Sequence, residues 1–197
     1  MKKIIIFFII SVSFISNSLS QIKNNITDFQ LLNVDGHYIS LKDFPDAKGF
    51  MIVFTSNHCP FATLYPQRLN ILNSHFKPLG VPLIAISSTD TVSYEEDNFD
   101  KMVYKAKKDH FNFPYLYDGS QTVAKDFGAQ KTPHAFLIWK EINGWKIKYN
   151  GAIDDNGMHP ELVKNTYLSV AVEKLLAEKE IPIKETKSIG CQIYFRK

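Results

Sequence analysis

The amino-acid sequence predicts an α/β domain with a mixed central sheet, helices on both faces and an N-terminal β-hairpin. Two short apolar runs, residues 50–55 and 81–88, have the length and composition of strands that are buried on both faces. Apolar residues at helical spacing follow each run, and strands that alternate with helices indicate a parallel sheet. A late hairpin pattern around residue 143 adds antiparallel strands, which makes the sheet mixed.

The N-terminal hairpin is expected within residues 27–43. Apolar residues alternate on both sides of Asp35 and Gly36, and Asp-Gly between two apolar runs is a strong hairpin signal. After the first buried strand, Pro60 suits the first turn of a helix. Apolar residues then recur at near-helical spacing as far as Phe76.

The second half of the chain contains three more helical patterns and a second hairpin. Gly128 marks the end of a short helix, and Asn143-Gly144 marks the turn of the hairpin. The last segment, residues 181–197, has little helical pattern and is expected to form a tail. The expected elements are a helix over 94–108, an extended piece at 113–117, a helix over 121–127, strands over 134–140 and 145–149, and a helix over 160–178.

The first twenty residues have the pattern of a secretory signal peptide. Lysines at 2–3 precede an apolar run over 4–15, and Ser18 and Ser20 are small residues at the positions that a signal peptidase reads. The alternative is an uncleaved membrane anchor, but this run is shorter than the ~20 apolar residues that span a bilayer. We therefore expect cleavage before Gln21 and export to the periplasm or the extracellular medium.

The expected organisation of the chain is a signal peptide at 1–20, one domain over 21–180, and a C-terminal tail over 181–197.

The charge and the cysteine content exclude two classes of function. The formal net charge of +3 includes the two lysines of the signal, so the mature chain is near neutral and nucleic acid is not an expected partner. Two cysteines without a Cys-x-x-Cys pattern make a structural zinc site unexpected.

Cys59 is the candidate for chemistry. The run from Phe54 to Ala62 takes the chain from a buried strand through Cys59 and Pro60 into a predicted helix. Free backbone N–H groups at a helix N-terminus stabilise an anion, so a thiol placed there has a lowered pKa and is reactive. A protonated His58 would lower that pKa further. The alternative is an inert cysteine that packs as a small apolar residue.

This corner of the sequence resembles the active-site corner of the thioredoxin superfamily. Cys59 stands five residues after Phe54 and matches the nucleophilic first cysteine of the family's Cys-x-x-Cys, while Ala62 stands at the second cysteine position. Thr132-Pro133, directly before an apolar run, matches the family's cis-proline loop. The resemblance implies a thioredoxin-like fold in which this loop faces Cys59 and contacts the substrate; an ordinary trans bond is the alternative.

The chain more closely resembles a peroxiredoxin-like branch of that superfamily, related to the alkyl hydroperoxide reductase and thiol-specific antioxidant proteins. Ser56 stands where members of the branch often have a further cysteine, and Ile52 stands where true peroxiredoxins have a proline. Cys59 and Cys191 are therefore the only cysteines that can pair. The segments that carry this resemblance are 57–62, 151–155 and 185–193, and it extends over roughly residues 27–195.

The resemblance implies a thiol oxidoreductase. In this hypothesis Cys59 attacks a disulfide or a peroxide, Cys191 resolves the product, and His58, Thr132 and Pro133 contact the substrate. Disulfide exchange is slightly favoured over peroxide reduction, because Ile52 stands where the motif of true peroxiredoxins has a proline. The expected partners are the substrate and a thiol reductant.

The alternative is a non-catalytic binding module in which a Cys59–Cys191 disulfide pins the tail to the domain. Spacing does not decide between a resolving and a structural role for Cys191, because it does not give the distance between the sulfurs. No organic cofactor and no metal are expected. Asp154 and Asp155 are adjacent loop carboxylates of the kind that bind cations, but such pairs are more often solvated turns.

Overall fold

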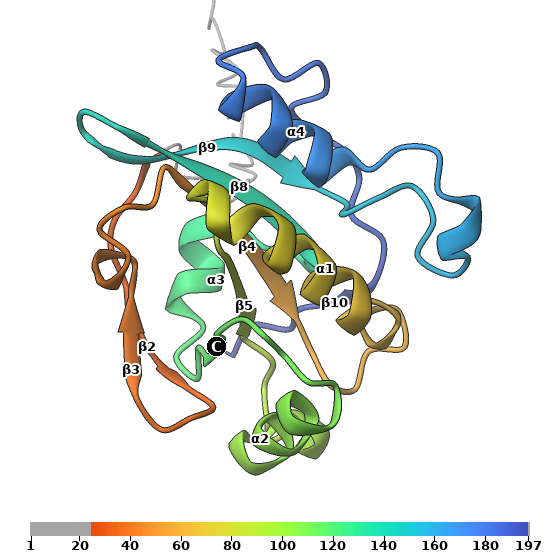
Figure 1. The fold of residues 1–197 in the computed structure, drawn as a ribbon. Coiled ribbons are helices and arrows are strands. Elements are labelled where there is room, and N and C mark those ends of the chain that lie inside the picture. The colour runs from red at the N-terminus through yellow and green to blue at the C-terminus, as the bar shows by residue number, and fades with distance from the viewer. Residues whose placement is uncertain (1–24, 197) are drawn as a thin grey trace, which may run out of the picture.

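The computed structural model describes residues 25–196 (Figure 1). The expected signal peptide and its cleavage site, at residues 1–20, lie outside the described residues. Within residues 25–196, no helix is both long enough and apolar enough to cross a bilayer.

The centre of the molecule is an eight-stranded mixed sheet with the strand order β1-β9-β8-β4-β5-β6-β2-β3. The three central strands β4, β5 and β6 run parallel, whereas β8, β9 and β2 pair antiparallel with their neighbours. A separate two-stranded ladder joins β7 to β10. The strands are β1 (Asn25–Ile26), β2 (Gln30–Asn33), β3 (Tyr38–Ser40), β4 (Gly49–Thr55), β5 (Leu83–Ser87), β6 (Tyr115–Tyr117), β7 (Lys131–Thr132), β8 (His134–Glu141), β9 (Gly144–Gly151) and β10 (Cys191–Gln192).

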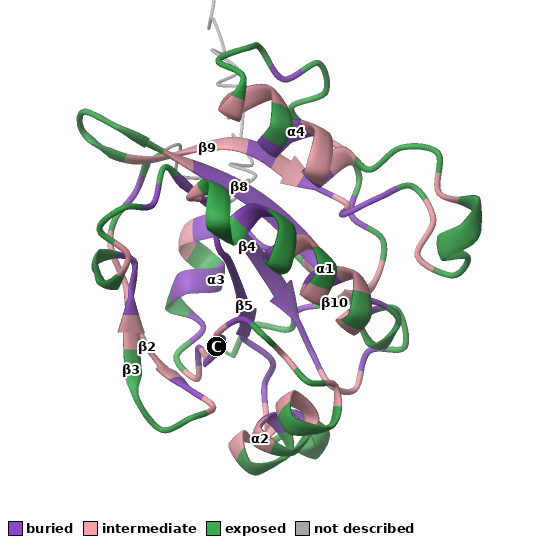
Figure 2. Ribbon diagram, viewed as in Figure 1, coloured by how far each residue is buried: buried purple, intermediate pink, exposed green. Residues whose placement is uncertain are grey.

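Helices cover both faces of this sheet, as the sequence predicts. The helices are α1 (Pro66–Phe76), α2 (Phe99–Lys108), α3 (Thr122–Phe127) and α4 (Tyr167–Leu176). Because side chains alternate along a strand, Phe50, Ile52 and Phe54 of β4 pack in the cluster that contains α3. Met51 and Val53 of the same strand pack in the cluster that contains α1, α4 and the buried Met102 of α2. Figure 2 shows the central strands buried and the outer sides of α1 and α4 exposed.

Both predicted hairpins are present. Gly36 forms the turn between β2 and β3 with a φ of +88°, and Gly144 begins β9 with a φ of +113°. Only glycine adopts such values without strain, which explains its place at these two turns. The structure therefore contains the mixed sheet and the β2–β3 hairpin that the sequence predicts.

The helix expected from Pro60 begins later, at Pro66. Residues 60–65 form tight turns that include a 3-10 segment (Ala62–Leu64). Proline has no N–H, so an α-helical hydrogen-bond ladder starting at Pro60 would break at Pro66. Pro66 is instead the first residue of α1, where a missing N–H costs nothing.

The helix expected over 160–178 is also shorter. A 3-10 segment (Pro160–Leu162) comes first, and α4 begins at Tyr167. Between them the carboxylate of Asp155 accepts hydrogen bonds from the backbone N–H groups of Lys164 and Asn165. Backbone groups bound to this side chain are not available to a helix, so the chain stays extended until Thr166.

Asn98 sets the start of α2, which begins at Phe99 rather than near residue 94. Its side-chain oxygen accepts a hydrogen bond from the backbone N–H of Lys101 at 2.9 Å. We expect Asn98→Ala to lower the free energy of unfolding by about 1 kcal/mol, because one helix-end donor loses its partner. Urea denaturation measures this loss. Asn98→Ser keeps an acceptor and should stay within about 0.5 kcal/mol of the wild type; equal losses for both variants would contradict the capping role.

Candidate active site

Cys59 lies just beyond the carboxyl end of β4, in the turns that lead to α1. Its side chain is fully buried. The thiol donates a hydrogen bond to the backbone carbonyl of Thr132, with 2.9 Å between Sγ and the oxygen. The Thr132–Pro133 peptide bond is cis, as the sequence predicts. The fold therefore places the cis-proline loop directly against the predicted nucleophile.

Cys191 also reaches this point, although 132 residues separate it from Cys59 along the chain. Strand β10 pairs antiparallel with β7, and Cys191 stands opposite Thr132 in the register. The backbone N–H of Cys191 donates to Sγ of Cys59 at 3.3 Å. Both cysteines are free thiols, and Cys191 is partly exposed where Cys59 is buried. The structure thus brings together the two cysteines that the sequence left at an unknown distance.

The surroundings of the two sulfurs push their pKa values in opposite directions. Burial by itself raises the pKa of Cys59, but hydrogen bonds from the Cys191 thiol and from the backbone N–H groups of Ala62 and Cys191 outweigh it, so this pKa is lowered. For Cys191, burial, the hydrogen bond to Cys59 and the negative charges of Cys59 and Asp97 raise the pKa to about 12. Of the two sulfurs, Cys59 is therefore the one that loses its proton more readily.

His58 is held by groups on the segment between β5 and α2. Its Nδ1 forms an ion pair with the carboxylate of Asp97, and its ring stacks on Tyr94 with 3.9 Å between centroids. Asp97 is completely buried and also accepts a hydrogen bond from the backbone N–H of Asn57. Sequence reasoning missed Asp97, because one acidic residue in a loop carries no motif and its contacts lie about forty positions away.

Thr132 contacts the site through its side chain as well as its carbonyl. Its hydroxyl lies 2.9 Å from the hydroxyl of Ser56. Gly190 packs so tightly on the other side of Thr132 that a Cβ atom there would stand 2.0 Å from the Thr132 carbonyl oxygen. Thr132 is therefore fixed between the Cys59 turn and the C-terminal tail.

A half-open cavity of about 470 Å³ adjoins Pro133. Its lining is mainly apolar and includes Phe61, two residues after Cys59, and Ile189, two residues before Cys191. The volume falls in the range of small-molecule binding sites. An apolar cavity thus lies on the side of the cis-proline where both cysteine-bearing segments meet.

Asp154 and Asp155, considered above as cation ligands, have other partners. Asp154 accepts hydrogen bonds from the Tyr65 hydroxyl at 3.0 Å and from Arg68 at 2.7 Å. The guanidinium of Arg68 also lies over the Tyr65 ring, 3.8 Å from its centroid. Asp154 therefore helps to hold the loop that lines the cavity, while Asp155 caps the segment before α4.

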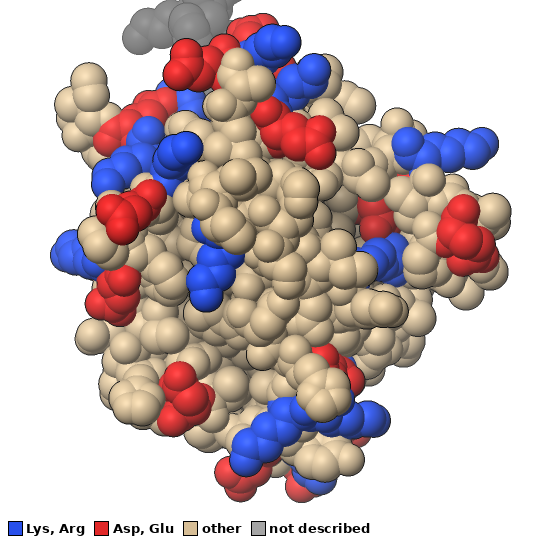
Figure 3. Space-filling view, in the orientation of Figure 1, with Lys and Arg blue, Asp and Glu red and all other residues tan. Residues whose placement is uncertain are grey.

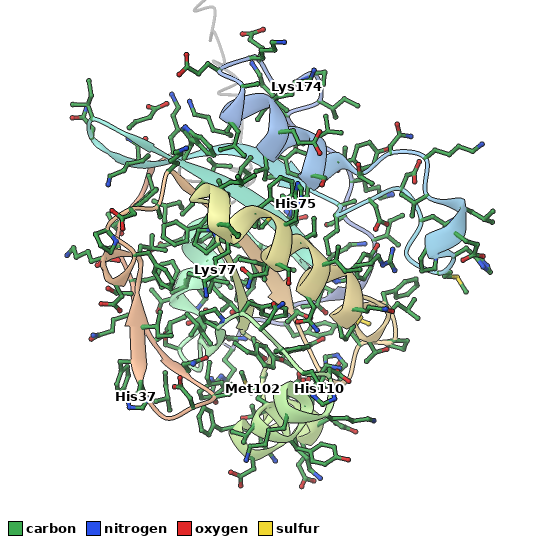
Figure 4. All side chains as sticks on the ribbon, viewed as in Figure 1. His37, His75, Lys77, Met102, His110 and Lys174 are labelled. Atoms are coloured by element: carbon green, nitrogen blue, oxygen red, sulfur yellow. The ribbon has the colours of Figure 1, made fainter. Side chains whose placement is uncertain are left out.

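The remaining charged and ligand-type side chains are dispersed. Figure 4 shows His37, His75 and His110 in three separate parts of the molecule: the β2–β3 turn, helix α1 and the turn after α2. Residues 25–196 contain no group of three His, Cys, Asp or Glu residues that would suit a metal ion. In Figure 3 basic side chains gather over α2, whereas the centre of the same face is mostly uncharged. On α2, Lys105 pairs with Asp109 at 2.8 Å, and Lys107 and Lys108 are exposed.

Comparison with known proteins identifies the family. The model of the AhpC/TSA family matches residues 22–152. A hypothetical protein from Sinorhizobium meliloti is 30% identical, with 91% of this chain and 97% of that chain covered and a TM-score of 0.80. An uncharacterized conserved protein from Geobacillus kaustophilus is 32% identical, with 91% and 94% covered and a TM-score of 0.80.

More distant matches share the fold. Peroxidoxin BcpB from Mycobacterium tuberculosis is 20% identical, with 79% of this chain and 93% of that chain covered and a TM-score of 0.53. No curated protein is significantly similar to the chain in sequence.

Proposed function

Because the chain belongs to the AhpC/TSA family, we propose that it is an exported thiol oxidoreductase in which Cys59 is the nucleophile and Cys191 the resolving cysteine. The observation that carries the proposal is the contact between the two cysteines. The N–H of Cys191 lies 3.3 Å from Sγ of Cys59, and their pKa values are displaced in opposite directions. In such a pair the cysteine with the lowered pKa is the better nucleophile, and the cysteine with the raised pKa stays protonated until it resolves the product.

With a peroxide, the Cys59 thiolate attacks one oxygen, so that an S–O bond forms and the O–O bond breaks. The leaving alkoxide or hydroxide takes a proton from solvent, and Cys59 becomes a sulfenic acid. Cys191 then loses its proton and attacks the Cys59 sulfur, which releases water and forms the Cys59–Cys191 disulfide. An external dithiol returns the two electrons and restores both thiols.

With a disulfide substrate, the same thiolate attacks one sulfur and the other leaves as a thiolate. Cys191 then displaces the bound half of the substrate from Cys59, and the same internal disulfide results. Both routes need Thr132 and Pro133 to position the substrate beside Sγ, with the neighbouring cavity open to its apolar part. In both routes His58, clamped by Asp97, fixes the turn that carries Cys59.

The pH dependence of alkylation tests the assignment of the nucleophile. In a Cys191→Ser variant we expect the rate at which iodoacetamide alkylates Cys59 to reach half its maximum below pH 8.5, the ordinary value for a cysteine. In a Cys59→Ser variant, burial and the charge of Asp97 still raise the pKa of Cys191, so this thiol should react more slowly than an ordinary cysteine at the same pH. A Cys59 midpoint at or above about 8.5 would contradict the proposal.

The redox potential of the intact chain distinguishes the oxidoreductase from the rival hypothesis, a binding module with a structural disulfide. A working redox pair should have a potential above about −250 mV, and a structural bridge should lie below about −300 mV. Equilibration with glutathione or dithiothreitol buffers measures it. A potential below −300 mV would favour the module, even if Cys59 itself were reactive.

A further inference from the structure

We propose that the C-terminal segment 187–193 is a strap that determines substrate size: small fluctuations of the strap admit a peroxide to Cys59, whereas a bulky disulfide reaches it only when the strap leaves β7. Gly190 is the residue that allows the strap to close. The inference rests on the proposed function in taking Cys59 as the reacting sulfur, and it adds which of the two substrate classes reacts without full opening of the strap.

The strap is held at both ends and passes over the reactive sulfur between them. On one side Thr186 donates its backbone N–H to Asn150 at 3.0 Å. On the other side the Gln121 side chain donates to the Tyr194 carbonyl and accepts from the backbone N–H of Arg196, both at 2.8 Å. The segment between these anchors contains Cys191, whose N–H reaches Sγ of Cys59.

Short-range contacts hold the strap itself, among them the packing of Gly190 on Thr132 and the buried Ser188. Its ladder with β7 has two residue pairs, and Ile193 adds one backbone hydrogen bond to Gln130 and a buried side chain. Ile189 is exposed, as is Gln192. Segments with so few buried contacts open locally far more often than the whole domain unfolds.

The strap forms part of the cover over Cys59, because the N–H of Cys191 contacts the Cys59 sulfur. The side chain of Cys59 has no exposed surface, so any reagent waits for an opening. A peroxide needs a gap of about the size of a water molecule, which small fluctuations of the strap supply. A disulfide in a second protein must bring polypeptide up to the sulfur, and this needs β10 to leave β7. The rate with such a substrate is reduced by the small fraction of molecules in the open state.

Gly190 is decisive because it lies against the carbonyl that Cys59 contacts. A Cβ at this position would stand 2.0 Å from the Thr132 oxygen and 2.6 Å from its carbon, and both are backbone atoms that cannot move aside. Gly190→Ala therefore forces the strap away from β7. The substitution changes none of the residues that anchor the two ends of the strap. Gln192→Ala is the matched control, because Gln192 is an exposed residue of β10 whose backbone pairing does not need its side chain.

The experiment compares small and bulky reagents in the full-length chain with Cys191→Ser, so that Cys59 is the reacting thiol. Single-turnover rate constants are measured with hydrogen peroxide and with disulfide-bonded insulin. We expect Gly190→Ala to raise the ratio of the insulin rate to the peroxide rate by about tenfold or more, and Gln192→Ala to leave it within about twofold. Ile193→Ala, which removes a buried strap contact without a backbone clash, should raise the ratio by a smaller factor.

Alkylation of Cys59 tests the strap independently of the proposed redox function. The same variants are treated with iodoacetamide and with a maleimide attached to polyethylene glycol, neither of which requires redox activity. A bulky-to-small ratio that is unchanged in both Gly190→Ala and Ile193→Ala would overturn the strap. A ratio that rises as expected, in a protein that reacts with neither peroxide nor insulin, would support the strap and overturn the oxidoreductase.

Discussion

Replacement of Cys59 by serine should abolish thiol-dependent reduction of peroxides and disulfides, with kcat/KM falling by at least about 10³-fold. A serine hydroxyl at neutral pH is not ionised and cannot take over the thiolate's attack. Cys191→Ser should behave differently, because the first oxidation still occurs at Cys59 while the internal disulfide cannot form. We expect one rapid turnover followed by a stop, with the oxidised sulfur trapped on Cys59.

The measurement is a time course of substrate loss with a protein dithiol such as thioredoxin as reductant, because a small dithiol would reduce the oxidised Cys59 directly. Mass spectrometry of the protein after one turnover, without reductant, accompanies it. The mass should show a sulfenic acid or a mixed disulfide on Cys59 in the Cys191→Ser variant. The wild type should instead lose two hydrogens as it forms the bridge. Sustained turnover in Cys59→Ser would contradict the assignment of the nucleophile, and undiminished turnover in Cys191→Ser would remove Cys191 from the resolving role.

The parts of the site that could be predicted from sequence are those whose residues are neighbours in the chain. The order strand, Cys59, Pro60 and apolar periodicity is local, and so is Thr132-Pro133 before the apolar run of β8. The hairpin turns at Gly36 and Gly144 belong to the same class, since two or three residues determine a turn. The strand before Cys59 and the two turns follow from a few neighbouring residues, whereas the cis Thr132–Pro133 bond is implied by the resemblance to the thioredoxin superfamily.

Element boundaries were less accurate where a second local rule competed with the first. Pro60 satisfies the preference for proline at a helix start, yet Pro66 interrupts the ladder and becomes the true start of α1. Before α4, the apolar periodicity of the sequence is outweighed by Asp155, which binds the backbone of Lys164 and Asn165. This side chain comes from a different loop, so no pattern within the helix could reveal it.

The tertiary contacts of the site could not be derived from sequence at all. The pairing of β10 with β7 joins segments about sixty residues apart in the chain, and its two-residue length carries no periodicity. Asp97 reaches the Cys59 turn from the loop after β5. Gly190 was visible only as a residue before Cys191, and its close approach to Thr132 explains why that position has no side chain.

His134, the residue after the cis-proline, should make the free energy of unfolding fall as the pH falls below about 6.5. It follows Pro133, is almost completely buried, and accepts a hydrogen bond from the backbone N–H of Gln130 at Nδ1, at 3.3 Å. Burial lowers its pKa to about 4, against which a hydrogen bond with Asn150 acts only weakly. In the unfolded chain a histidine titrates near 6.5. His134 is therefore neutral at physiological pH.

Above pH 6.5 the residue is neutral in both states and contributes nothing to the pH dependence. Between pH 6.5 and about 4 the unfolded chain binds a proton that the folded protein does not, so the free energy of unfolding falls as the pH falls. The full loss is about 3 kcal/mol, reached near pH 4. We expect urea denaturation of the wild type between pH 7 and pH 4 to show this loss together with contributions from carboxylates.

His134→Gln isolates the share of His134, because glutamine keeps an acceptor but does not titrate. The difference in unfolding free energy between wild type and variant should shift by about 3 kcal/mol in the variant's favour on going from pH 7 to pH 4. His37→Gln is the control, since the side chain of His37 is 84% exposed in the β2–β3 turn. A difference that stays constant with pH would mean that His134 takes up its proton in the folded protein, which would place a cation beside the cis-proline and change the electrostatics of the cysteine pair.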